Sequence, residues 1–140
     1  MRENLPDGSW RQKGEHVAFT YRRLAPGVLL TTIKGYDKGE FGMGALDELT
    51  NELKRFGSLH LFVDTSASTG VTTEVREAWT AWFQANQSQL QVVWVFVDSR
   101  FIEQVVSVAK FFSRTGDLMK ITSDRALFDR QLERVQAASR

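Results

Sequence analysis

The 140-residue sequence contains no cysteine, and histidine occurs only at His16 and His60. Without cysteine the chain can form no disulfide bond, thiolate zinc site or cysteine nucleophile. The two histidines lie far apart, both in segments with strand character, so they lack the close spacing of a metal-binding pair. We therefore expect no metal site and no cofactor.

An excess of one charge is also missing, because 18 Lys and Arg residues nearly balance 17 Asp and Glu residues. This balance gives the chain no overall attraction to nucleic acid or to anionic lipid. No apolar run approaches the roughly 18 residues that a membrane helix requires. We expect a cytoplasmic protein that binds no nucleic acid and has no integral membrane segment.

Residues 1–15 are polar and lack the apolar centre of a signal peptide. They predict a flexible N-terminal arm, in which Trp10 could contact the surface of the protein. Residues 16–140 have the length of one domain, so a single α/β domain is expected after the arm.

Strand and helix patterns alternate through this domain. Residues 16–24 alternate between apolar and polar side chains, and a second strand pattern covers 28–36 after the turn signal Ala-Pro-Gly, which predicts an antiparallel hairpin. Apolar residues at helical spacing then alternate with short apolar runs. The predicted helices cover 40–56, 71–87, 99–114 and the segment after Asp124, and the strands between them cover 58–64, 90–98 and 117–122.

Strands that are joined through single helices run parallel, with right-handed crossovers. The order of elements is therefore β-β-α-β-α-β-α-β-α. It predicts a mixed, mostly parallel five-stranded sheet with helices packed against it.

A hydroxyl-rich segment follows the strand at 58–64, with the sequence VDTSASTGVTTEV over residues 63–75. Ligands of open α/β sheets bind beyond the carboxyl ends of the strands, and a helix N-terminus favours anions. The segment lacks the lysine of a nucleotide-binding loop. It is a candidate phosphorylation, anion-binding or partner-binding loop, with the residues Asp64, Thr65, Ser66, Ser68, Thr69 and Gly70. The alternative is a structural one, in which Thr72 or Thr73 caps the next helix.

Asp64 and Asp98 each end an apolar strand, so their carboxylates could lie close together and hold a metal for hydrolytic chemistry. Neither aspartate belongs to an Asp-x-Asp pattern, and no lysine or general base is spaced near them. We therefore expect no catalytic residue and no enzyme.

The third predicted helix carries more apolar residues than one contact with a sheet requires. A partner, a second subunit or a small apolar ligand could cover the excess, and so could neighbouring helices. The candidate apolar surface consists of Phe101, Val105, Val108, Phe111 and Phe112.

Four segments together resemble the STAS superfamily, the fold of the anti-sigma-factor antagonists, and in particular a divergent bacterial STAS/CRAL-TRIO-like branch. They are LHLFVDTSASTG, QVVWVFVD, VAKFFSRTG and ITSDRALFDRQLERV, and the resemblance covers roughly residues 16–136. In STAS antagonists a kinase phosphorylates the hydroxyl residue before the glycine of an Asp-Ser-Ser-Gly loop. The resemblance places Thr69 at that position and Ser68 beside it, with Ala67 in place of the family aspartate.

The resemblance and the residues together predict a non-enzymatic regulator that acts through contacts with another protein of unknown identity. The segment 65–73 and the adjacent helix starts would form its binding surface. One alternative is a carrier or sensor of a lipid-like or other apolar small molecule. Another alternative is a structural homodimer that forms through the third helix.

Overall fold

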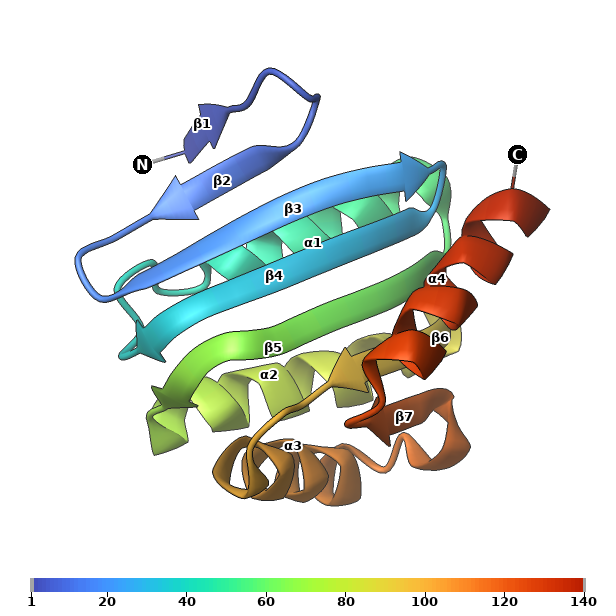
Figure 1. Cartoon of the computed structure of the whole chain (residues 1–140). Coiled ribbons are helices and arrows are strands. Elements are labelled where there is room, and N and C mark those ends of the chain that lie inside the picture. Colours follow the sequence, from blue (N-terminus) through green and yellow to red (C-terminus); the bar gives the residue numbers. More distant parts are fainter. Residues whose placement is uncertain (1, 140) are drawn as a thin grey trace.

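The computed structural model describes residues 2–139 as one seven-stranded sheet with four α-helices (Figure 1). Two short 3-10 turns, Gln87–Gln89 and Gly116–Leu118, precede the sixth and seventh strands. The elements are β1 (Arg2–Asn4), β2 (Trp10–Lys13), β3 (Val17–Ala25), β4 (Val28–Asp37), α1 (Gly44–Phe56), β5 (Leu59–Val71), α2 (Thr73–Asn86), β6 (Leu90–Phe96), α3 (Arg100–Ser113), β7 (Met119–Thr122) and α4 (Arg125–Ala138).

The strands lie side by side in the order in which they occur along the chain. Strands β1 to β4 pair antiparallel, and β4 to β7 pair parallel through the crossover helices. The sequence therefore predicted the five strands β3 to β7 and their directions correctly. The prediction of five strands in all was wrong, because two further strands extend the sheet beyond β3.

The two additional strands come from the N-terminal segment, for which the sequence predicted a flexible arm. Strand β2 pairs with β3, and β1 pairs with β2. Trp10 anchors the pair, since its side chain is 5% exposed and its ring stacks on Tyr21 with centroids 5.6 Å apart. Its indole Nε1 also donates to Glu48 Oε1 at 2.6 Å. The segment is thus part of the sheet.

Helices cover the two faces of the sheet unequally. Helices α1, α2 and α3 cover one face, and their apolar residues join the main core with Phe19, Leu29 and Leu61. Helix α4 alone lies on the opposite face (Figure 1), where Phe128 packs against Val28, Phe62 and Phe96 in a second, smaller cluster. We call the first face the three-helix face and the second the α4 face. A large part of the α4 face carries no helix.

The helix boundaries follow local capping signals. Thr72, Ser99 and Asp124 each accept a hydrogen bond from a backbone N–H in the first turn of α2, α3 and α4. Gly57 ends α1 in the left-handed conformation, as expected of a C-cap glycine. Helix α1 begins at Gly44 and not near residue 40 as predicted, because residues 40–43 form turns. Among residues 2–139, no helix has the length and apolar character needed to cross a membrane.

Candidate functional site

The predicted hydroxyl-rich loop is in fact the second half of a long strand. Strand β5 continues to Val71, whereas its neighbour β6 ends at Phe96, opposite Asp64. Beyond Asp64, β5 pairs only with β4, and two register shifts mark bulges in this part. The expectation of a loop after residue 64 was wrong, because pairing with β4 holds these small polar residues in a strand.

Because neighbouring residues of a strand point to opposite faces, the six candidate residues do not form one site. Thr65 and Ser68 point to the three-helix face and line a cavity there. Asp64 and Ser66 point to the α4 face, where both contact Arg125. The two remaining residues are Thr69, which is exposed, and Gly70, which is buried beneath the ring of Tyr36.

Gly70 is required by its position in this strand. Its φ of 142° lies in the region that favours glycine, and a Cβ there would come within 3.1 Å of the Tyr36 ring. The Ser68 hydroxyl has a local role as well, because its Oγ accepts a hydrogen bond from Gly70 N at 3.3 Å. Thr69 is therefore the accessible hydroxyl of the Ser68–Thr69 pair.

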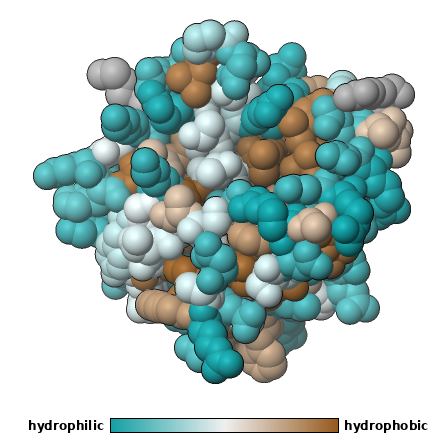
Figure 2. Space-filling model, in the orientation of Figure 1, coloured by the Kyte–Doolittle hydropathy of each residue, from teal (hydrophilic) through white to brown (hydrophobic). Residues whose placement is uncertain are grey.

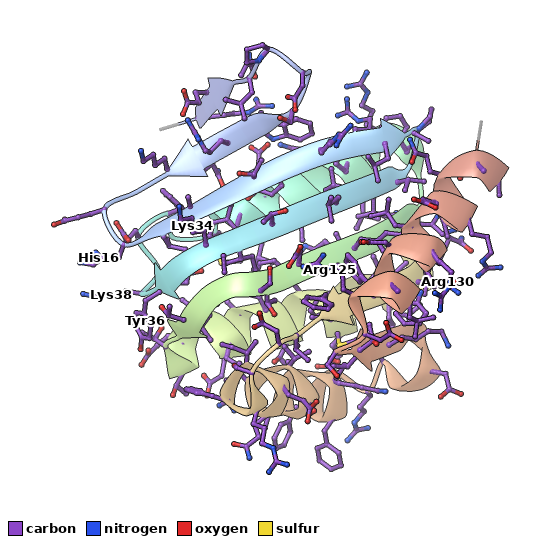
Figure 3. All side chains as sticks on the ribbon, in the orientation of Figure 1. His16, Lys34, Tyr36, Lys38, Arg125 and Arg130 are labelled. Atoms are coloured by element: carbon purple, nitrogen blue, oxygen red, sulfur yellow. The ribbon has the colours of Figure 1, made fainter. Side chains whose placement is uncertain are left out.

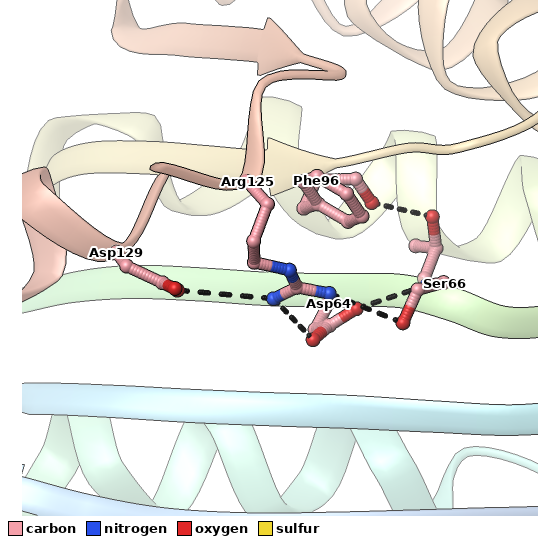
Figure 4. A network of polar contacts seen from close by, with 6 residues as sticks. Asp64, Ser66, Phe96, Arg125 and Asp129 are labelled. Carbon is pink, nitrogen blue, oxygen red and sulfur yellow. Dashed lines mark hydrogen bonds and ion pairs between the residues drawn. The ribbon is translucent and has the colours of Figure 1, made fainter. Parts of the chain in front are cut away.

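A polar network fixes the first half of the segment on the α4 face (Figure 4). Arg125 Nη1 donates to Asp64 Oδ2 at 2.9 Å, and its Nη2 donates to Ser66 Oγ at 3.3 Å. The other carboxylate oxygen of Asp64 accepts from Ser66 N at 2.9 Å. The guanidinium also lies over the Phe96 ring, 3.9 Å from its centroid, and 3.8 Å from Asp129. Arg125 therefore joins the start of α4 to β5 and β6.

The network determines the charge state of Asp64. Burial alone would raise the pKa of this carboxyl, but the hydrogen bonds from Arg125 and Ser66 outweigh burial and lower its pKa. Asp64 is thus a stable carboxylate whose oxygens already have donors. Lys34 and Tyr36, near the carboxyl end of β4, lie on the same face of the sheet as Arg125 of α4 (Figure 3).

Asp98, the other aspartate predicted at a strand end, shares Arg125 with Asp64 as a charged neighbour. It is exposed just beyond β6, and Arg125 lies in the field of Asp64, Asp98 and Asp129 together. Within residues 2–139, no group of three or more His, Cys, Asp or Glu side chains gathers in a way that could hold a metal ion.

On the three-helix face, an apolar cavity of about 80 Å³ lies between the sheet and helices α2 and α3. A water molecule needs only about 10–15 Å³ by this measure, so a small apolar group would fit. The cavity is lined mainly by apolar side chains from β5, β6, α2 and α3, among them Val63, Trp79, Val95, Ile102, Val105 and Ala109.

Two surface grooves, of about 350 and 400 Å³, lie between α2 and α3. Arg76 of α2 lines the cavity and both grooves. On α3, Phe101, Val105 and Val108 line the first groove, and Val108 and Phe112 line the second. The cavity and the grooves therefore share residues along the α2–α3 boundary.

The three aromatic residues of the candidate apolar surface on α3 are exposed within residues 2–139. Phe101, Phe111 and Phe112 are 54%, 75% and 62% exposed, and the rings of Phe111 and Phe112 contact each other edge to face. In Figure 2, hydrophobic surface lies among hydrophilic residues in the lower part of the view, where Figure 1 places α3. Two of the five candidates, Val105 and Val108, are half-buried in the groove.

A third aspartate, which was not among the predicted site residues, also lies at a strand end. Asp37 ends β4 on the three-helix face, where its side chain is 5% exposed. Its Oδ1 accepts one hydrogen bond, from Gly39 N at 2.8 Å. Burial raises the pKa of Asp37 against the opposing effect of that bond, and the charge of Glu40 raises it further. Asp37 follows an apolar strand as Asp64 does, so the same signal could have identified it.

Comparison with solved structures identifies the class of fold. One match is an uncharacterised protein of the DUF3478 family, with a SpoIIAA-like fold, from Shewanella loihica PV-4. It superimposes with a TM-score of 0.62 at 15% sequence identity, over 86% of this chain and 98% of that chain. The protein thus has the SpoIIAA-like, or STAS, fold that its sequence predicted. Comparisons with protein-family models and with curated proteins gave no match.

Proposed function

We propose that the protein is a non-enzymatic regulatory domain that binds a partner protein through the α2–α3 surface. This surface consists of Phe101, Val105, Val108, Phe111 and Phe112 together with the two grooves beside them. The observation that supports the proposal is the clustering of exposed aromatic rings. Three of the five large apolar side chains that are exposed among residues 2–139 lie on α3.

The surface favours an amphipathic segment as the partner. Exposed aromatic residues beside a groove resemble the anchors and pockets that carry most of the binding energy in protein interfaces. Arg76 and Glu77 are the charged residues that line the two grooves. A helix with apolar residues at helical spacing would place them between α2 and α3, in the helix-in-groove mode.

Substitution of one exposed ring tests the surface without disturbing the core. Phe112→Ser should weaken capture of the partner at least tenfold in a quantitative pull-down from the native cell, since Phe112 lines the second groove and an aromatic anchor contributes about 2 kcal/mol or more. Tyr36→Ser is the matched control, because Tyr36 is an exposed aromatic residue on the other face of the sheet. Equal capture by both variants would contradict the proposal.

The same variants distinguish a second copy of the chain from a different partner. Light scattering at increasing concentration should show a monomer if the partner is another protein. A dimer in the wild type that is lost in Phe112→Ser would instead identify the surface as a homodimer interface.

The apolar cavity supports a second candidate function, the binding of a small apolar molecule. Its walls at Val63, Val95 and Ala109 offer only apolar contact, and the shared residue Val105 would couple a ligand to the α2–α3 surface. Native mass spectrometry of protein purified from its own cell tests this function. A mass shift is expected for the wild type, and its loss is expected when Ala109→Leu reduces the cavity.

Phosphorylation at Thr69 would fit the regulatory role, because Thr69 is exposed whereas Ser68 lines the cavity. A phosphate would add about −2 charge to a strand that pairs only with β4. Phosphopeptide analysis through the growth cycle should find the group on Thr69 and not on Ser68.

A further inference from the structure

A hollow of about 340 Å³ opens between the end of β4, the turns before α1 and the first turn of α2. We call it the Asp37 hollow, because the carboxylate of Asp37 lies in its wall. It adjoins the apolar cavity on the three-helix face, with which it shares Asp37 and Trp79. It is separate from the grooves between α2 and α3.

Asp37 is buried without a cationic partner. None of the ion pairs formed within residues 2–139 includes this carboxylate, and it accepts a single hydrogen bond, from Gly39 N. Lys38 lines the same hollow but is exposed and does not pair with Asp37 (its position after β4 is visible in Figure 3). A buried carboxylate is costly unless it is paired, so the site would gain from a cation.

Aromatic residues form another part of the wall. Phe19 lies in the centre, with its centroid 5.9 Å from that of Phe41 and 6.4 Å from that of Trp79. All three residues line the hollow, and the side chain of Met43, 53% exposed, lies at its rim. Aromatic faces attract cations through their quadrupoles, and they favour ammonium groups that are only weakly hydrated.

The charges around the hollow favour a cation as well. Glu74 lines it from the first turn of α2, so two carboxylates oppose the single positive charge of Lys38. A metal ion would require several oxygen ligands, and the described residues offer no such group here. An anion would be repelled by the negative charges of Asp37 and Glu74.

We propose that the Asp37 hollow binds an organic ammonium group, with the Asp37 carboxylate as its counter-charge and the rings of Phe19, Phe41 and Trp79 as its apolar wall. The group can belong to a free amine or to the side chain of a lysine in another protein, since both present the same chemistry. The proposal is independent of the α2–α3 surface and its partner.

Ligand titrations with charged probes and their neutral analogues test this proposal. Two-dimensional NMR spectra of the ¹⁵N-labelled full chain are recorded with n-butylammonium and choline, and with 1-butanol and 3,3-dimethylbutan-1-ol as analogues of similar shape. We expect shifts at Lys38, Gly39 and the indole of Trp79, with at least one ammonium probe binding about tenfold more tightly than its neutral analogue.

Substitutions show whether the preference depends on Asp37. Asp37→Asn keeps the acceptor for Gly39 N and removes the charge, so ammonium and neutral probes should bind within twofold of each other. Glu74→Gln should reduce ammonium binding by about threefold, because Glu74 is exposed and its charge is screened. Asp117→Asn, an exposed aspartate outside the hollow, serves as the control and should leave both affinities unchanged.

A last probe, N-acetyl-lysine methylamide, distinguishes the two sources of the ammonium group. Tighter binding of this probe than of n-butylammonium would indicate a lysine of a partner protein, and weaker binding would indicate a free amine. Equal affinities for charged and neutral probes in the wild type would overturn the proposal. So would an unchanged ammonium preference in Asp37→Asn, or shifts confined to residues outside the hollow.

Discussion

Asp37 and Asp64 each follow an apolar strand segment in the sequence, but they lie in opposite environments in the fold. Each lies at the carboxyl end of a strand pairing, Asp37 at the end of β4 and Asp64 where β6 stops beside β5. Asp64 faces α4 and has Arg125 as a partner, whereas Asp37 faces the three-helix side and pairs with no cation among residues 2–139. The two faces therefore give the two carboxylates different surroundings, because that of Asp64 lies against Arg125 whereas that of Asp37 accepts a hydrogen bond only from the backbone N–H of Gly39 within residues 2–139.

The largest effect should come from removing the paired carboxylate. Asp64→Ala leaves Ser66 N–H and the Arg125 guanidinium without their acceptor, so the free energy of unfolding should fall by about 2 kcal/mol. Urea denaturation at neutral pH measures this change. Asp129→Ala is the control, because Asp129 is exposed and 3.8 Å from Arg125. Its effect should stay within about 0.5 kcal/mol, and an equal loss in both variants would contradict the distinction.

Removing the charge of the unpaired carboxylate should have the opposite sign. Asp37→Asn retains the hydrogen bond from Gly39 N and abolishes a buried negative charge, so the free energy of unfolding should rise by about 1 kcal/mol at neutral pH. Thermal and urea denaturation both report this gain. A clear loss of stability would show that Asp37 has a partner in solution that stabilises its charge.

The smallest effect is the difference between the two carboxyls in the pH dependence of stability. The pKa of Asp37 is raised in the folded protein. Its contribution to the free energy of unfolding is therefore fully present below the unfolded pKa of about 3.9, and it is lost as pH rises through the folded pKa. The pKa of Asp64 is lowered in the folded protein. Its contribution to the free energy of unfolding is therefore present above a pH of about 3.9, and it is lost as pH falls through the folded pKa. Denaturation of Asp37→Asn and Asp64→Ala from pH 2.5 to pH 8 separates the two contributions.

Much of the fold could be predicted from the sequence, because its signals are local. The strand patterns from β3 to β7, the caps at Thr72 and Ser99 and the C-cap at Gly57 each depend on neighbouring residues. Strands β1 and β2 were missed, since they are only three and four residues long and a single apolar residue, Trp10, shows no strand periodicity without the sheet. The second half of β5 was missed because Ser, Thr and Gly are typical of loops, and only β4 holds them extended.

The candidate site was harder to predict, because its contacts join distant parts of the chain. Arg125 meets Asp64 from the first turn of the last helix, and no local pattern connects the two. The exposed rings on α3 were found, since an overly wide apolar arc is visible in the sequence. The hollow beside Asp37 depends on Phe19, Phe41 and Trp79, which come from three separate elements and gather only in the folded protein.

Titration of the side-chain carboxyl carbons by NMR tests the contrast between the two faces most directly. Asp37 should titrate with a pKa above the ordinary aspartate value of about 3.9, and Asp64 should titrate with a pKa below it. Addition of the ammonium probe that binds should lower the pKa of Asp37 and leave that of Asp64 unchanged. The reverse order of the two pKa values, or equal values, would contradict the account.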